Sequence, residues 1–176
     1  LRGKGTTYGC NAVYRDFTPD YLVSLDRHIS QEIAENYDVE NLPAYSININ
    51  QKRYSEHFIL IPRNPVMNTG ATATHIARFD GHSKIYLLGF DSYNTDPKKT
   101  NNVYVNTNAY AKEEETYEYD LWTRQMVTLF TKYKDVQFYR VGSKIIDAYN
   151  NLDNVIHIKY DDLKDMIWNC QQNISK

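Results

Sequence analysis

The sequence predicts an α/β protein, in which a mostly parallel sheet lies between helices on both of its faces and gives three layers. Short apolar runs of strand length alternate along the chain with segments whose apolar residues recur at helical spacing. The run at residues 84–89 is apolar on both faces, which is typical of a central strand in a parallel sheet. A chain of 176 residues is long enough for a domain with its own core. We therefore expect a single domain over residues 1–176.

The first elements read as two strands followed by a helix. Residues 6–14 and residues 21–25 carry β-branched and aromatic side chains, which predicts a strand in each segment. A turn over residues 15–20 separates them. Apolar residues then recur every four positions, at Ile29, Ile33 and Tyr37. This spacing puts them on one stripe of a helix over residues 27–36.

Two strands and a helix follow in the middle of the chain. Residues 44–49 alternate apolar and polar side chains, as a strand with one solvent-facing side does. Residues 58–61 form a further strand, which the prolines after it stop. Small residues at 71–77 allow a helix to lie close to a sheet, and Asn68 or Thr69 can cap that helix.

The strand at residues 84–89 leads directly into Asp91. A carboxylate just past the carboxyl end of a parallel strand stands where sheets of this class bind ligands. Residues 94–111 are polar, rich in Asn, Thr and Tyr, and too long for an ordinary connection. We expect this segment to be a mobile lid.

The last part of the chain predicts two helices and two closing strands. Residues 113–133 show apolar side chains at helical spacing, with acids early and lysines late, as the helix dipole prefers. Strands are expected at residues 136–141 and 155–158. A final helix begins at Asp161 or Asp162.

Composition excludes several classes of protein. The 20 basic and 22 acidic residues give a net charge of −2, which argues against a protein that coats nucleic acid or an anionic membrane. The longest apolar runs have strand length, so no membrane span is expected. The two cysteines show no metal-binding or disulfide spacing, and a reducing cytoplasm is the expected compartment. The sequence leaves self-association open.

Familiar phosphate-binding motifs do not occur. The chain has no GxGxxG and no Walker A sequence. The glycine-rich, basic residues 1–5 precede a strand, whereas a phosphate loop follows one, so a simple turn is the favoured reading. No GxSxG elbow, HExxH or HxxxH pattern is present among the five histidines.

Two polar sites near the predicted strands could each have either a structural or a ligand-binding role. Asn11 lies inside or at the end of a strand, where its amide either ties down a neighbouring loop or faces a ligand, because an unpaired buried amide is costly. Asn68, Thr69 and Gly70 open a helix and offer backbone N–H groups to an anion, although a capped helix without a ligand is the more frequent case.

Acidic residues near the first strands offer a third alternative. Asp16, Asp20 and Asp26 surround one strand, and three acids can hold a divalent metal. Turn chemistry at Asp20 and a helix cap at Asp26 are the competing explanations, which we favour.

Several of these pieces occur together in a known family. Residues 8–14 (YGCNAVY), residues 19–23 (PDYLV), the pair Thr69-Gly70 and residues 85–93 (IYLLGFDSY) resemble the bacterial sialyltransferases that use CMP-sialic acid. The same residues are similar to the hydroxymethylpterin diphosphokinase-like family of Rossmann-type proteins. The resemblance covers about residues 6–93, or half of the chain, and implies a Rossmann-like fold.

The resemblance also implies a set of binding residues. The strand asparagine contacts the nucleotide, the helix start contacts the donor, and the segment after the later strand and the lid line the site. In this sequence the matching residues are Asn11, Asn68, Thr69, Gly70, Asp91 and Tyr93. The sequence departs from the family pattern in two ways. First, the family's first strand and nucleotide loop have no match, and we expect them upstream of Leu1. Second, the family has a catalytic histidine after the lid, whereas this sequence has no histidine between His82 and His157.

The leading functional hypothesis is a nucleotide-binding, glycosyltransferase-like protein that transfers a sugar from a nucleotide-activated donor. Tyr104 and Tyr110 of the lid would shield the donor from water and bind its phosphate, and Asp91 would orient a hydroxyl group. One alternative is a magnesium-dependent, pterin diphosphokinase-like enzyme, in which Asp26 and Asp91 hold the metal. Another is a non-catalytic module that binds a nucleotide or a glycan. No cofactor other than a nucleotide-sugar donor or magnesium is indicated.

Overall fold

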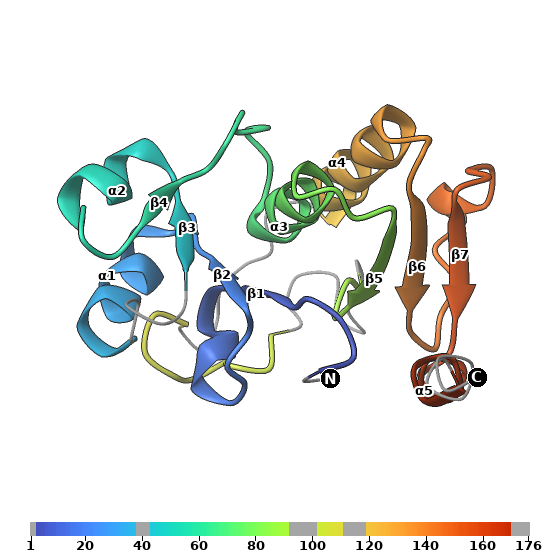
Figure 1. The fold of residues 1–176 in the computed structure, drawn as a ribbon, viewed down its shortest axis with the longest axis horizontal. Helices are drawn as coiled ribbons and strands as arrows, with labels where there is room; N and C mark the ends of the chain where they lie inside the picture. Colours follow the sequence, from blue (N-terminus) through green and yellow to red (C-terminus); the bar gives the residue numbers. More distant parts are fainter. Residues whose placement is uncertain (1–2, 38–42, 92–101, 111–118, 170–176) are drawn as a thin grey trace, which may run out of the picture. The chain divides into compact units, whose positions relative to one another are not determined.

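The computed structural model describes residues 3–37, 43–91, 102–110 and 119–169, and the chain divides into two compact units (Figure 1). The N-terminal unit comprises Leu1–Gly81 and Thr95–Tyr117, and the C-terminal unit comprises His82–Asn94 and Glu118–Lys176. Each unit holds its own parallel sheet, so the chain is an α/β, Rossmann-like protein. One domain over the whole chain stays a prediction.

The sheet of the N-terminal unit has four parallel strands in the order β1-β2-β3-β4. Its strands are β1 (Tyr8–Cys10), β2 (Tyr21–Val23), β3 (Ala44–Ser46) and β4 (Ile59–Leu60). Its helices are the 3-10 helix η1 (Asn11–Arg15), α1 (Arg27–Asn36), α2 (Asn48–Arg53) and α3 (Thr69–Phe79). Because all four strands run in one direction, their carboxyl ends lie at one edge of the sheet.

Helices cover both faces of this sheet. Successive side chains of a strand point to opposite faces, and β2 shows the consequence. Leu22 packs with Ile29 and Ile33 of α1 in one apolar cluster. Its neighbour Val23 packs with Ala73 and Ile76 of α3 in another. The N-terminal unit therefore has the expected three layers, with α1 and α3 on opposite sides of the strands.

The sheet of the C-terminal unit has three parallel strands in the order β5-β6-β7. Its elements are β5 (Lys84–Leu88), α4 (Tyr119–Lys132), β6 (Gln137–Val141), the 3-10 helix η2 (Asp147–Tyr149), β7 (Val155–Ile158) and α5 (Tyr160–Asn169). Among the described strands β5 pairs with β6 alone, so it ends this sheet instead of taking the expected central place.

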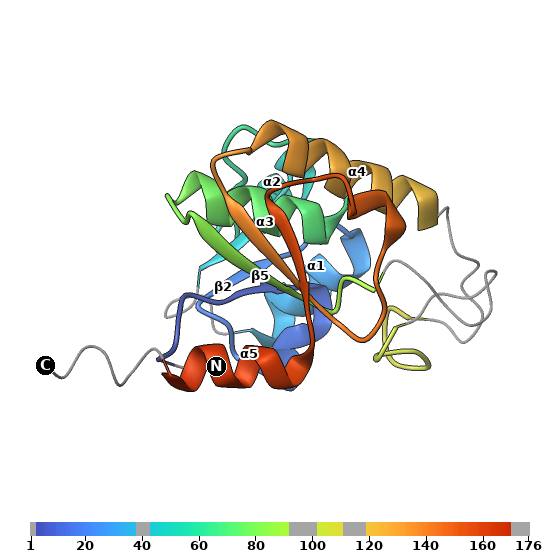
Figure 2. The same ribbon diagram turned by 90° about the vertical axis from the view of Figure 1, so that its right-hand side faces the viewer.

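The core of the C-terminal unit forms between α4 and the strands (Figure 2). Phe130 of α4 lies with its ring centroid 4.7 Å from that of Phe138 on β6, and 5.2 Å from that of Tyr149 on η2. All three side chains are almost fully buried. On the last helix, Leu163 is buried. Burial of these aromatic side chains removes a large apolar area from water and stabilises the C-terminal unit.

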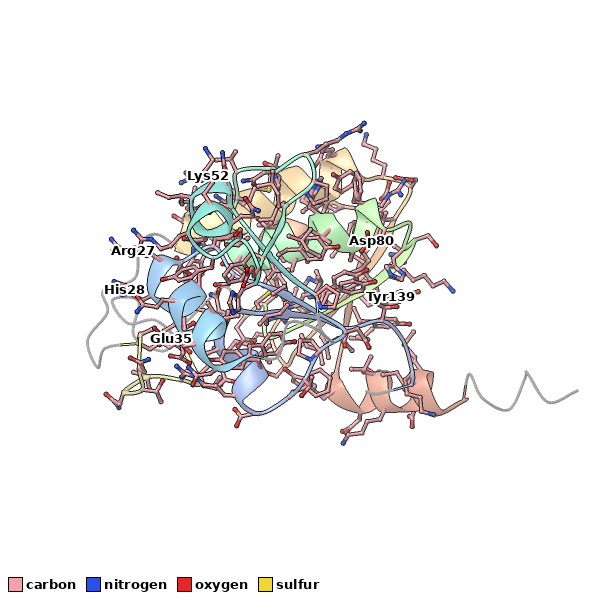
Figure 3. All side chains as sticks on the ribbon, turned by 60° about the vertical axis from the view of Figure 1, so that its left-hand side comes forward. Arg27, His28, Glu35, Lys52, Asp80 and Tyr139 are labelled. Carbon is pink, nitrogen blue, oxygen red and sulfur yellow. The ribbon has the colours of Figure 1, made fainter. Side chains whose placement is uncertain are left out.

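Tyrosines stack across the strands of both sheets. In the N-terminal unit the rings of Tyr8 and Tyr21 have centroids 5.0 Å apart, and those of Tyr21 and Tyr45 are 6.0 Å apart. In the C-terminal unit Tyr86 stacks on Tyr139, which is labelled in Figure 3, at 4.7 Å. Tyr8 with Tyr21 and Tyr86 with Tyr139 are register partners on neighbouring parallel strands, whereas Tyr45 is the register partner of Val23. We call these rows of rings tyrosine ladders.

Some element boundaries differ from the predicted ones. The first strand ends at Cys10 and not at residue 14, because Asn11 adopts a positive φ of 51° and η1 begins there. The strand expected at residues 44–49 ends at Ser46, and α2 follows it. The helices α1 and α3 and the strand β7 lie where they were predicted. Of the helix expected at 113–133, residues 113–118 lie outside the described part.

None of the helices in the described part of the chain combines the length and the apolar character that crossing a membrane requires.

Candidate functional site

The candidate site lies at the carboxyl edge of β1 and β2. These strands are register partners through Cys10 and Val23, so Asn11 and Asp26 both follow the carboxyl end of a strand. Gly9 makes the turn after β1 tight, because a Cβ at this position would lie 2.5 Å from Val13 Cγ1. The chain can therefore fold η1 back over β1 and present Asn11 at the edge.

The side chain of Asn11 is only half satisfied. Its Nδ2 atom donates a hydrogen bond to Asp26 Oδ2 at 3.4 Å. Its Oδ1 atom is buried and has no hydrogen-bond partner in the described part of the protein. The amide cannot gain by flipping, because Oδ1 would then face the carboxylate oxygen of Asp26. A buried acceptor without a donor lowers the stability of the folded protein by about 1–3 kcal/mol unless a water or a ligand donates a hydrogen bond to it.

The start of α3 lies beside the same edge. Cys10 Sγ donates a hydrogen bond to the Thr69 carbonyl at 3.8 Å, which brings the residue before Asn11 against the first turn of α3. Asn68 caps the helix, since its Oδ1 accepts from the N–H of Ala71 at 3.0 Å. The N–H groups of Thr69 and Gly70 precede the first helical hydrogen bond. The Thr72 N–H donates the first such bond to the Asn68 carbonyl.

Cys10 is a free cysteine next to Asn11. Burial raises the pKa of its thiol to about 12, and a thiol attacks only as the thiolate. Its role at the edge is to hold β1 against α3.

Asp26 stands at the N-cap position of α1 without capping it. Its backbone has the extended conformation of a cap residue (φ −76°, ψ 136°), but its carboxylate makes no hydrogen bond to the first turn. The residue is exposed. The Asn11 amide donates to one of its two carboxylate oxygens, Oδ2.

A buried polar network fixes the backbone beside Asp26. Asn50 of α2 donates from Nδ2 to the Leu25 carbonyl and to the Ser30 hydroxyl, both at 2.9 Å. Ser46, at the end of β3, donates to the Ser24 carbonyl at 2.5 Å. These bonds join the ends of β2 and β3 to α1 and α2. The carboxyl edge is therefore rigid before any ligand binds.

The three acids of the suggested metal cluster, Asp16, Asp20 and Asp26, each have a different hydrogen-bond partner. Asp20 accepts hydrogen bonds from the backbone and hydroxyl of Thr7, both at 2.7 Å, and Asp16 accepts one from Tyr104. Asp26 faces Asn11. Nowhere in the described residues do three or more His, Cys, Asp or Glu side chains gather in a way that could hold a metal ion.

The described part of the expected lid packs against the N-terminal unit. Tyr104 and Tyr110 contact the apolar cluster around α1, and their rings lie 5.5 and 6.0 Å from the guanidinium carbon of Arg15. Both tyrosines thus flank an arginine of the same unit, and the donor-shielding role expected for them stays a prediction. The rest of the proposed lid, residues 94–101 and 111, lies outside the described residues.

Glu32 of α1 binds residues 102–110 to the rest of the N-terminal unit through Asn108. It is 8% exposed and accepts hydrogen bonds from Tyr14 at 2.5 Å, from Arg15 Nε at 2.7 Å and from Asn108 Nδ2 at 2.6 Å. Burial by itself would raise the pKa of Glu32, but the hydrogen bonds from Tyr14 and Arg15 and the charge of Arg15 lower it below its ordinary value. We call Tyr14, Arg15, Glu32 and Asn108 the Glu32 clasp.

Asp91 belongs to the C-terminal unit, where a buried arginine holds it. Arg140 of β6 is fully buried, and its Nη2 lies 3.6 Å from Asp91 Oδ1. The same guanidinium donates to the Phe90 carbonyl at 3.3 Å and to the Lys144 carbonyl. Arg140 therefore joins the segments after β5 and β6. Tyr93, the other residue expected here, lies outside the described part.

His157, on β7, belongs to the C-terminal unit. Its ring stacks on Tyr149 with the centroids 6.1 Å apart. Burial and the charge of Arg140 lower the pKa of this imidazole below its ordinary value.

The structure thus gathers part of the predicted set in one unit. Asn11 and the helix start formed by Asn68, Thr69 and Gly70 lie at one edge of the N-terminal sheet, and Asp91 belongs to the other unit. The sequence reading missed the Glu32 clasp and the place of Arg140. The signal for Arg140 was a charged residue inside an otherwise apolar strand.

Comparisons with protein-family models, with curated proteins and with solved structures found no match for this chain.

Proposed function

We propose that the protein binds a nucleotide or a nucleotide sugar at the carboxyl edge of β1 and β2. The observation that carries this proposal is the Asn11 side chain, whose buried acceptor atom has no hydrogen-bond partner among the residues that the structure describes. It occupies a left-handed backbone position directly after a parallel strand. Uncommon backbone conformations and unpaired buried groups cost free energy, and both concentrate at functional sites.

The site offers two kinds of group to a ligand: the N–H groups at the start of α3 and the acceptor oxygen of Asn11. Together they favour a ligand with an anionic end and with a hydroxyl or amide group elsewhere. The N–H groups of Thr69 and Gly70 carry the positive end of the α3 dipole, which favours a phosphate. Asn11 Oδ1 requires a donor, such as an amide, amino or hydroxyl group. A nucleotide supplies both kinds of group in one molecule.

The reaction we propose is transfer of a sugar from a nucleotide-activated donor. The support is the resemblance of residues 6–93 to CMP-sialic-acid-dependent sialyltransferases. In such a transfer a hydroxyl group of the acceptor loses its proton. The residue that removes the proton is unassigned.

The proposal is tested by thermal shift and calorimetry over a panel of nucleoside mono- and diphosphates and CMP-sialic acid, with and without magnesium. The variant is Asn11→Gly, because glycine keeps the positive φ while removing the amide. A ligand at 100 times its dissociation constant should stabilise the wild-type protein by about 2.7 kcal/mol. Loss of one buried hydrogen bond should weaken binding by about 1–3 kcal/mol, or about 5- to 150-fold.

Asn106→Gly is the matched control. Asn106 also has a positive φ, of 65°, but it is exposed and follows none of the sheet strands. It should bind like the wild type. The proposal fails if no member of the panel stabilises the protein, or if Asn11→Gly binds as tightly as Asn106→Gly. Binding without turnover would identify a binding module, and turnover that depends strictly on magnesium would favour diphosphoryl transfer over sugar transfer.

A further inference from the structure

We infer that residues 102–110, which we call the strap, hold the 3-10 helix η1 in place through Arg15, so that Arg15 positions Asn11 for its ligand. The helix η1 begins at Asn11 and ends at Arg15, and the strap binds its far end. The role of Asn11 rests on the proposed nucleotide-binding function, whereas the attachment of the strap to η1 does not. Arg15 is a positioning residue, because it acts on the ligand through Asn11.

Every nitrogen of the Arg15 guanidinium donates a hydrogen bond. Nε donates to Glu32 Oε1 at 2.7 Å and Nη2 to Glu32 Oε2 at 2.6 Å, so the guanidinium binds α1 through two parallel bonds. Nη1 donates to the Thr107 hydroxyl at 2.7 Å, and Nη2 also donates to the Asn108 carbonyl at 2.9 Å. Arg15 therefore joins η1 to α1 and to the strap, which Figure 1 draws in yellow beside η1.

The strap folds around this arginine. Its backbone makes tight turns, since the N–H groups of Thr107 and Tyr110 donate to the Tyr104 and Thr107 carbonyls at 3.1 and 3.0 Å. These turns place the rings of Tyr104 and Tyr110 with their centroids 6.3 Å apart. The guanidinium carbon of Arg15 lies 5.5 and 6.0 Å from the two centroids, where aromatic faces attract a cation. The strap therefore binds Arg15 through polar and aromatic contacts together.

The same short helix carries a costly conformation at its other end. Asn11 has a left-handed φ of 51°, and such a conformation persists only where the surrounding structure enforces it. The hydrogen bonds of a 3-10 helix have poor geometry, so the five residues of η1 need contacts from outside to keep their shape. The strap supplies these contacts at Arg15 and, through the Tyr104 hydroxyl, at Asp16. Release of the strap should therefore let Asn11 leave its binding conformation.

The test uses the full chain with a strap variant, Thr107→Val combined with Asn108→Ala. The changes remove the hydroxyl that accepts from Arg15 and the amide that donates to Glu32 Oε2 at 2.6 Å. Both residues are exposed, so the apolar core stays intact. In hydrogen exchange followed by mass spectrometry, we expect the backbone N–H groups of residues 13–17 to exchange about 5-fold faster or more, because local opening becomes easier. Those of β2 should keep the wild-type rate.

The second measurement is a double-mutant cycle with Asn11→Gly, by calorimetry with the nucleoside mono- and diphosphates and CMP-sialic acid as probes. For a probe that binds, the strap variant should weaken the affinity of the otherwise wild-type protein by about 5-fold or more. In the Asn11→Gly background it should cause no further loss, because the strap acts through Asn11. Equal losses in both backgrounds would identify a merely structural role and overturn the inference.

Val103→Ala is the matched control, because Val103 belongs to the strap and its side chain is 89% exposed. It should behave like the wild type in both measurements. An unchanged exchange rate of residues 13–17 in the strap variant overturns the inference, whatever the affinities are. Absence of binding for every probe refutes the proposed function, and the exchange rates then decide alone whether the strap holds η1. Should exchange in β2 also become faster, Asn108→Ala alone replaces the double change.

Discussion

Gly142 shows how one residue without a side chain supports a buried charge. A Cβ atom at this position would lie 2.5 Å from Arg140 Nη1 and 2.8 Å from Arg140 Cζ. Arg140 cannot withdraw freely, because its guanidinium is bound to the Phe90 and Lys144 carbonyls. The glycine is therefore needed for the space it leaves open.

Replacing this glycine should destabilise the protein. We expect Gly142→Ala to lower the free energy of unfolding by about 1–3 kcal/mol, the usual cost of forcing extra atoms into a packed site. Urea denaturation measures the change. Gly5→Ala is the control, since nothing lies within 4 Å of a Cβ built at Gly5; equal stability of the two variants would contradict the packing argument.

At the scale of single helices, α1 and α3 differ in how they begin. Asn68 caps α3 through the N–H of Ala71, whereas Asp26 leaves the first turn of α1 uncapped. Asn68→Ala should therefore lower the free energy of unfolding by about 0.5–2 kcal/mol. Asp26→Ala should lower it less, because only a favourable charge at the helix start is lost. Denaturant unfolding of both variants checks this order, and the reverse order would show that the Asp26 carboxylate caps α1 in solution.

The elements that sequence could predict are those fixed by periodicity. Ile29 and Ile33 recur at helical spacing, and they place α1 at the predicted residues. The end of β1 could not be found in this way, because Val13 and Tyr14 favour a strand as strongly as the residues before them. The left-handed φ of Asn11 and the close approach over Gly9 decide where the strand stops, and both depend on tertiary packing.

The candidate site was predictable to a similar extent. Asn11 and the Asn68–Gly70 segment follow from strand ends and capping rules, since a polar residue in such a place needs a partner. Asp26 was open to three explanations, and only its uncapped geometry separates them. Glu32 lies beside Ile33 in the helix stripe, and its three partners, Tyr14, Arg15 and Asn108, come from distant segments that local patterns do not connect.

For the molecule as a whole, the Glu32 clasp predicts a loss of stability in acid. The pKa of Glu32 is lowered in the folded state, so the folded protein binds fewer protons there than the unfolded chain does. Its contribution is complete above the ordinary glutamate pKa of about 4.3 and is lost as the pH falls through the lower folded value. In Glu32→Gln the unfolding free energy should be smaller at neutral pH and should fall less steeply between about pH 5 and pH 3.

Denaturant unfolding at a series of pH values measures both quantities. Glu35→Gln, on the outer side of the same helix (Figure 3), should keep the wild-type pH dependence. An unchanged slope in Glu32→Gln would mean that the clasp does not hold in solution.

The division into two units also distributes the light-absorbing side chains unevenly. The chain has 2 tryptophans, Trp122 and Trp168, and both fall within the residues of the C-terminal unit. The N-terminal unit carries tyrosines, including its ladder of Tyr8, Tyr21 and Tyr45, and no indole. Emission excited in indole alone consequently reports on one unit, while far-ultraviolet circular dichroism reports on both. The wild-type protein thus contains its own optical label for asking whether its two halves melt as one cooperative system.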